Sequence, residues 1–274
     1  MNPVFEILPQ DIDAAQTSII VEVSDESFSY FVINDESRMI TGSCIFHFDT
    51  NNAEKNIAVV LNKILDKQPL LKRYYNRIFI SYSFNESLLI PGLYYDENKN
   101  NENINLVYGD LQEGVILTDH VAEKELFNTY RIPSNIHSAM SAQFPTASFA
   151  HQYSLLLKQL PNAGSELNVI FYPNKVVVTL LKEGRLQIIQ TFNYKTSEDA
   201  VYYMLNVCNQ FQANEVNVQL SGMIEKDSNM FREINKYFLT TTFTDLPREY
   251  EYADGIKELP THFFSHLFST ALCV

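Results

Sequence analysis

The chain has 274 residues, of which 46% are hydrophobic and 19% charged, a composition typical of a folded globular protein. Asp and Glu outnumber Lys and Arg by 33 to 20, and the resulting formal charge of −13 repels the phosphate backbone of nucleic acids, so we expect no nucleic-acid ligand. No stretch reaches the roughly 18 uninterrupted apolar residues of a transmembrane helix. Residues 1–6 lack the basic and apolar regions of a secretion signal, which predicts a cytoplasmic protein.

The first half of the chain predicts three strands, an amphipathic helix and a fourth strand. The helix has apolar side chains on one face, and either Asn51 or Asn52 is its expected N-cap. In chain order the expected elements are strands 18–23, 28–33 and 39–48, helix 52–67 and strand 77–82.

Residues 84–165 connect this unit to a second one. We expect residues 96–105, which are almost wholly polar, to form an exposed loop. Beyond it we expect two strands, a helix that opens at Pro133, a short strand and a helix that ends near Leu160. The strands are expected at 115–121, 125–131 and 147–150.

The second half repeats the order of the first. The expected elements are strands 167–172, 175–181 and 186–192, helix 197–211 and strand 215–220. Two β-β-β-α-β units argue for a duplicated α/β domain with a mixed sheet in each copy, although a chance similarity of order is the alternative. Residues 161–165 are the best linker, which divides the chain into domains 1–163 and 164–274.

Four further elements are expected after Ser221. They are a helix at 225–238, a strand at 239–244, a surface loop at 248–255 and a C-terminal helix at 260–270. The last helix carries the apolar stripe Phe263–Phe268, which we expect to pack on its own domain, with docking of a partner as the alternative.

This element order resembles the actin-like ATPase superfamily, whose domains have a ribonuclease H-like fold. Phrases such as Tyr130-Arg-Ile-Pro133 and Phe144-Pro-Thr-Ala-Ser-Phe-Ala-His151 are similar to a bacterial family of unknown function. That family in turn resembles, in outline, the actin-like proteins of type IV pilus assembly and cell division. The resemblance covers about residues 15 to 245 and implies a nucleotide site between two domains.

The resemblance also implies an Asp-x-Gly turn after the first strand of each repeat. Glycine lets backbone N–H groups approach phosphate, and the aspartate holds hydrated Mg²⁺. The first turn here, residues 23–27, has no glycine and places Glu26 beside Asp25, which repels a polyphosphate unless a metal intervenes. The second turn, residues 171–175, contains Pro173, which lacks an N–H, and we expect it to be too short to cradle a phosphate. Both phosphate turns are therefore expected to be lost.

Three residues remain as candidates for a residual nucleotide contact. Asp25 is the candidate for Mg²⁺, and Ser221 with Gly222 is the candidate for adenosine, since the superfamily has a Gly-Gly at that place. A single glycine after a strand is weak evidence for such a contact, and a simple strand-to-helix turn is the favoured interpretation.

Other motifs do not amount to a site. Gly109 and Gly114 have P-loop spacing, but no Lys-Ser/Thr follows, so we expect a turn. His262 and His266 are four residues apart on the expected C-terminal helix, but no third metal ligand accompanies them. The three cysteines form no CxxC pair and predict neither a disulfide nor a zinc site.

The sequence thus predicts a non-catalytic actin-like binding or scaffold protein that has protein partners, no cofactor, no metal and no catalytic residues. The alternative is a divergent nucleotide-binding ATPase, in which Asp25 or Glu26 holds Mg²⁺ and Ser221-Gly222 contacts adenine. An unrelated enzyme with a cleft that the sequence does not reveal is the third hypothesis.

Overall fold

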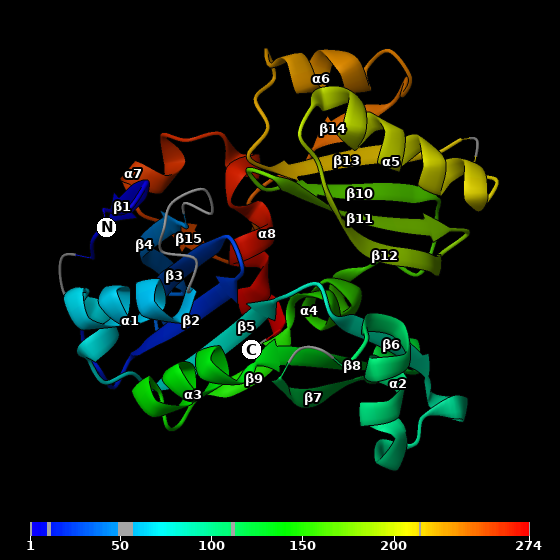
Figure 1. Ribbon diagram of the computed structural model, residues 1–274. Coiled ribbons are helices and arrows are strands. Elements are labelled where there is room, and N and C mark those ends of the chain that lie inside the picture. Colours follow the sequence, from blue (N-terminus) through cyan, green and yellow to red (C-terminus); the bar gives the residue numbers. More distant parts are fainter. Residues whose placement is uncertain (1, 10–11, 49–56, 111–112, 214, 274) are drawn as a thin grey trace. The chain divides into compact units, whose positions relative to one another are not determined.

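The computed structural model describes residues 2–9, 12–48, 57–110, 113–213 and 215–273. The chain forms two compact units (Figure 1). Unit 1 comprises residues 1–159, 249–256 and 273–274, and unit 2 comprises residues 160–248 and 257–272.

The main sheet of unit 1 has the strand order β1-β4-β3-β2-β5-β9, and β15 also pairs with β4. β2 pairs in parallel with β5, which pairs in parallel with β9, whereas β2, β3 and β4 form an antiparallel meander. The strands are β1 (Phe5–Ile7), β2 (Thr17–Ser24), β3 (Ser27–Asn34), β4 (Met39–His47), β5 (Arg77–Ser83), β9 (Ser148–His151) and β15 (Glu251–Tyr252).

The sheet of unit 2 has the order β12-β11-β10-β13-β14, with the same strand directions as β4-β3-β2-β5-β9. A register shift occurs at the same place in both units, between Val32 and Ile33 of β3 and between Leu180 and Leu181 of β11. A shared order, shared directions and a shared irregularity are what a duplicated domain predicts. The strands are β10 (Glu166–Phe171), β11 (Lys175–Lys182), β12 (Arg185–Asn193), β13 (Asn217–Gly222) and β14 (Thr241–Phe243).

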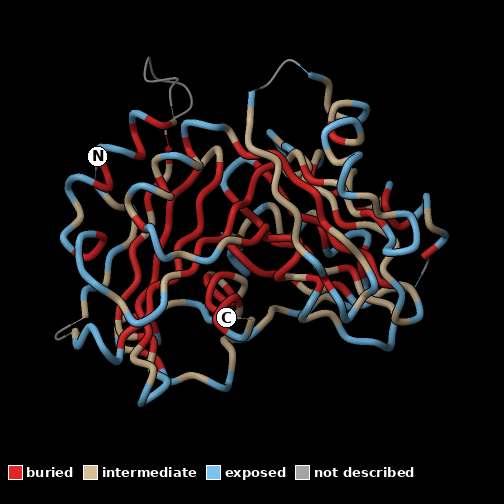
Figure 2. Tube along the Cα trace, turned by 90° about the horizontal axis from the view of Figure 1, so that it is seen from below, coloured by how far each residue is buried: buried red, intermediate tan, exposed pale blue. Residues whose placement is uncertain are grey.

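The apolar faces of the sheets are covered by the predicted helices. Helix α1 (Ile57–Lys67) buries Leu61 and Ile64 in the core of unit 1, and the expected N-cap residues lie outside the described residues. Helix α5 (Ser197–Gln210) begins with a capping box in which Thr196 and Asp199 bond reciprocally to each other's backbone N–H. Figure 2 shows that the long buried runs follow the strands. The predicted β-β-β-α-β order is thus confirmed in both halves.

An antiparallel three-stranded sheet is inserted between β5 and β9. Its order is β6-β8-β7, formed by β6 (Ser87–Pro91), β7 (Gly114–Val121) and β8 (Leu126–Pro133). The sequence predicted β7 and β8 but not β6. Helices α3 (Ser134–Gln143) and α4 (Gln152–Gln159) follow as expected.

The expectation of a loop at residues 96–105 was wrong. A 3₁₀ turn at Glu97–Lys99 leads into helix α2 (Asn100–Tyr108). The Asp96 carboxylate accepts the N–H of Asn98, Ile104 is fully buried, and Arg131 of β8 donates to Asn105 Oδ1 at 2.9 Å. Tertiary contacts therefore stabilise a helix whose Asn-rich sequence favours a loop.

The C-terminal region also differs from the prediction. Residues 260–270 do not form one helix but the short segments Thr261–Phe263 and Ser265–Phe268, separated by Phe264 with φ −121°, and a 3₁₀ turn at Ser269–Cys273 follows. The first two segments contact β13, and Phe264, Leu267 and Phe268 are buried, so the apolar stripe packs on its own domain as expected.

Three more predicted elements differ from the structure: two are shorter than expected and one was misassigned. Helix α6 (Asn229–Ile234) and β14 each cover part of the predicted range. The expected surface loop at 248–255 contains β15, whose Tyr252 is buried, and the start of helix α7 (Asp254–Lys257).

Candidate functional site

The turn between β2 and β3 satisfies its own backbone donors. Ser24 is fully buried, and its Oγ accepts the N–H groups of Glu26 at 3.1 Å and Ser27 at 2.9 Å. The hydroxyl also lies 2.9 Å from Ser27 Oγ. These N–H groups are therefore already paired within the turn, beside the half-buried candidate Asp25.

The turn between β10 and β11 closes in another way. The Tyr172 N–H donates to Lys175 O at 2.9 Å, and the Tyr194 hydroxyl donates to Tyr172 O at 2.8 Å. Lys175 is 1% exposed, with Nζ 5.6 Å from the centroid of the Tyr172 ring. The pairs Val23–Phe28 and Phe171–Val176 each enclose four residues, so this turn is as long as the first, not shorter.

A buried carboxylate lies near the end of β2, where the sequence did not suggest one. Glu22 is 3% exposed and accepts from Gln152 Nε2 at 3.2 Å, while Gln152 Oε1 accepts from Ser83 Oγ at 2.9 Å. Burial of a carboxylate is costly unless hydrogen bonds compensate for the lost water. A single charged residue inside an otherwise apolar strand was the sequence signal for this position.

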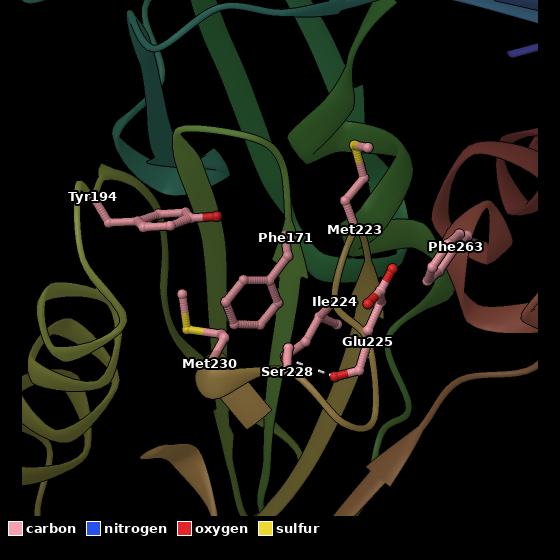
Figure 3. A pocket seen from close by; sticks show the side chains of 8 residues that line it. All are labelled: Phe171, Tyr194, Met223, Ile224, Glu225, Ser228, Met230 and Phe263. Carbon is pink, nitrogen blue, oxygen red and sulfur yellow. Dashed lines mark hydrogen bonds between the residues drawn. The ribbon is translucent and has the colours of Figure 1, made fainter. Parts of the chain in front are cut away.

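A pocket of about 240 Å³ lies in unit 2, where the parallel strands β10 and β13 end (Figure 3). In open α/β sheets the carboxyl ends of parallel strands are the usual position of ligand sites. The pocket is lined by the end of β10, the residue after β12, the segment between β13 and α6, the start of α6, and the short helical segment at Thr261–Phe263. The lining residues are Phe171, Tyr194, Met223, Ile224, Glu225, Ser228, Met230 and Phe263.

The candidates Ser221 and Gly222 lead into this pocket, but its lining starts at Met223. Ser221 is buried in β13, opposite Ile170. Gly222 has φ +81°, and a Cβ atom there would lie 2.2 Å from Phe171 O. The backbone conformation and the close approach to Phe171 therefore explain glycine at this position, and no ligand is needed to account for it. Asp25 belongs to unit 1, whereas Ser221 and Gly222 belong to unit 2.

The pocket is lined by apolar and aromatic side chains, with few polar groups (Figure 3). Ser228 Oγ donates to Glu225 O at 2.6 Å and accepts the Phe231 N–H at 3.2 Å, which caps α6. The Tyr194 hydroxyl is occupied by Tyr172 O. The lining includes no Lys or Arg, so the pocket offers an apolar surface and the Glu225 carboxylate but no cation for a phosphate.

The two C-terminal histidines are held by packing. His262 is 3% exposed, its Nε2 lies 2.7 Å from Ile224 O, and burial lowers its pKa. The Nδ1 atom of His266 is buried and has no hydrogen-bond partner among the described residues. The described part of the chain contains no group of three His, Cys, Asp or Glu residues that could hold a metal ion.

His266 is expected to make the stability of the fold dependent on pH. Burial lowers the pKa of His266 from 6.5 to about 4. Between these two pH values His266 is protonated in the unfolded chain but neutral in the folded chain. The contribution of His266 to the free energy of unfolding is therefore fully present above pH 6.5, and it decreases by about 2–3 kcal/mol as the pH falls towards 4. In denaturant titrations at pH 7.5 and pH 4.5, His266→Leu is expected to lose less stability between the two values than wild type does. An equal loss in both proteins would contradict this prediction.

Within the described residues, no helix is long and apolar enough to cross a membrane.

Comparison with solved structures identifies the fold. A Bacteroides thetaiotaomicron protein described as having an actin-like ATPase fold and unknown function is 16% identical, with a TM-score of 0.73 over 84% of this chain and 91% of its own. The PilM-PilN type IV pilus biogenesis complex contains a chain that is 9% identical, with a TM-score of 0.58 over 95% of this chain and 99% of its own. The duplicated units therefore have the actin-like ATPase fold that the element order predicted.

Sequence comparison gives the family. No curated protein matches the chain. A family model described as "Protein of unknown function (DUF3822)" matches residues 10–240. The chain belongs to this family, and its fold is that of the actin-like ATPases.

Proposed function

We propose that this protein is a non-catalytic actin-like binding or scaffold protein, built from duplicated domains 1–163 and 164–274, that acts in the cytoplasm through protein partners. The observation that supports this most directly is that backbone donors in two turns, between β2 and β3 and between β10 and β11, are already paired or missing. Ser24 Oγ accepts two of the N–H groups in the first turn, and in the second Tyr172 N–H bonds within the turn while Pro173 has no N–H. Phosphate binding needs free backbone donors or an exposed cation at these positions, and Lys175 of the second turn is only 1% exposed.

Similarity to a chain of the PilM-PilN complex supports the part of the proposal that concerns partners, because that complex joins two proteins. The Met-containing pocket in unit 2 supports it as well, since flexible thioether side chains adapt to varied apolar ligands.

Thermal unfolding with millimolar Mg-ATP or Mg-ADP tests the absence of a nucleotide site. A ligand at 100 times its dissociation constant adds about 2.7 kcal/mol of stability. We expect no rise in Tm with either nucleotide and no phosphate release above a protein-free control. A rise of several degrees, or sustained phosphate release, would overturn the proposal.

The second candidate is a divergent nucleotide-binding ATPase of the pilus-assembly or cell-division type, with Asp25 or Glu26 holding Mg²⁺ and Ser221-Gly222 next to adenine. Glu22 favours it, because Glu22-Val23-Ser24 has the acid-x-small spacing of an Asp-x-Gly turn and Glu22 is buried against Gln152. If Mg-ATP raises the Tm, comparison of Glu22→Gln with Asp25→Asn identifies the carboxylate that the effect needs. A rise that survives both substitutions argues against either residue as the Mg²⁺ ligand.

A further inference from the structure

A second hollow lies beside the 240 Å³ pocket of unit 2 and shares the lining residues Glu225 and Phe263 with it. Its volume is about 540 Å³, and five of its seven lining residues are polar or charged. The lining residues are Glu225, Lys226, Asp227, Pro260, Thr261, His262 and Phe263. The segment between β13 and α6 therefore borders two adjoining hollows of different character, which we call the apolar hollow and the polar hollow.

The polar hollow carries uncompensated negative charge. Glu225 and Asp227 are exposed, and within the described residues neither carboxylate has a hydrogen bond or an ion pair. The Nζ atom of Lys226 lies 5.3 Å from the centroid of the Phe243 ring. Burial lowers the pKa of His262, which is therefore uncharged at neutral pH. Two carboxylates face one lysine, so this hollow attracts a cation.

The apolar hollow suits one large side chain. At about 240 Å³ it is smaller than the 300–1,000 Å³ typical of pockets for whole drug-sized ligands. Met223 and Met230 lie on opposite sides of the Phe171 ring in Figure 3, and thioether side chains adjust readily to aromatic or branched groups.

We infer that the two hollows together bind an extended segment of a partner protein, in which a large apolar side chain enters the apolar hollow and a nearby Lys or Arg enters the polar hollow. The inference rests on the proposed function and specifies which side chains the partner presents. In an extended chain, residues i and i+2 point to the same side about 7 Å apart, so two such side chains can enter two hollows that share lining residues. The net charge of −13 favours approach of such a basic segment.

Methionine methyl groups report on the apolar hollow directly. The chain has six methionines, of which Met223 and Met230 line this hollow while Met140 and Met204 are fully buried elsewhere. The full chain with ¹³C-labelled methionine methyls is titrated with the acetylated, amidated peptide Gly-Phe-Gly-Arg-Gly, and signals are assigned with Met223→Leu and Met230→Leu. We expect saturable shifts at Met223 and Met230 and none at Met140 or Met204.

Two control peptides separate the contributions of the hollows. Replacement of Phe by Ala should abolish the shifts, and replacement of Arg by Glu should weaken binding beyond measurement. The double variant Glu225→Gln/Asp227→Asn should weaken the arginine peptide about three- to tenfold, which is the range for two solvent-accessible ion pairs. Glu183→Gln, in the turn at the opposite end of the same sheet, removes a carboxylate and should leave affinity unchanged.

Two outcomes overturn the inference. Absence of shifts at Met223 and Met230 at millimolar arginine peptide would exclude binding of such a partner segment. Shifts caused by adenosine but not by the peptide would instead assign the apolar hollow to a nucleoside. The proposed function is tested separately. Stabilisation by Mg-ATP together with phosphate release would contradict it, whatever the result of the peptide titrations.

Discussion

Replacement of Gly222 by alanine is expected to destabilise the protein by about 3 kcal/mol or more, which makes it one of the most damaging single substitutions. The left-handed conformation, φ +81°, costs an L-residue roughly 1–2 kcal/mol. The new methyl group would also lie 2.2 Å from Phe171 O and 2.9 Å from Phe171 N, so the ends of β10 and β13 must separate. Phe171 lines the apolar hollow, which we expect to deform as well.

Gly164→Ala is the matched control. Gly164 has φ +88° in the same unit, but nothing lies within 4 Å of the position of its Cβ. It should cost only the conformational strain, roughly 1–2 kcal/mol. Urea unfolding of both variants measures the difference, and equal losses would show that the close approach to Phe171 is relieved at no cost.

Replacement of Arg131 by leucine is expected to destabilise the inserted sheet by about 3–5 kcal/mol, the usual cost of removing one partner of a buried ion pair. Arg131 is 5% exposed, and its guanidinium pairs with Glu86. The same group donates to Asn105 Oδ1 and to Gly109 O, each at 2.9 Å, and so holds the C-terminal end of α2 against β8. Its loss leaves the Glu86 carboxylate without this charge and α2 without its anchor.

Amide hydrogen exchange distinguishes this local effect from general unfolding. In Arg131→Leu, protection should fall first in α2 and β8, while the strands of unit 2 keep theirs. Arg131→Lys keeps the charge but lacks the planar fork, so it should recover only part of the stability. Full recovery by lysine would contradict the role given to the contacts with Asn105 and Gly109.

The central strands of both units were predictable because β-branched and aromatic runs bounded by polar turns leave few alternatives. Helix α2 was not, since its sequence is rich in Asn and its stability comes from Ile104 and from Arg131, a residue 26 positions beyond Asn105. The C-terminal helix was predicted as continuous because its periodicity says nothing of the non-helical dihedral at Phe264.

The candidate site shows the same limit. The absence of glycine in both turns was visible in the sequence, but the role of Ser24 in satisfying the turn depends on side-chain geometry. Gly222 was recognised, and the structure adds its backbone reason. Glu22 was passed over because its partner Gln152 is 130 residues away. The two hollows combine the end of β10, the segments after β12 and β13, and the start of α6 with residues 260–263, a combination that periodicity does not reveal.

The order of the segments in unit 1 has a consequence for synthesis. Because β15 pairs with Met39 and Ile40 of β4, the ribosome must translate past residue 252 before that edge is complete. Residues 160–248, most of unit 2, therefore emerge and can begin to fold while unit 1 still lacks its last strand. A nascent chain stalled at residue 248 is expected to leave the backbone of Met39 and Ile40 open to chaperones or to another chain, until Glu251 and Tyr252 are added and pair with it.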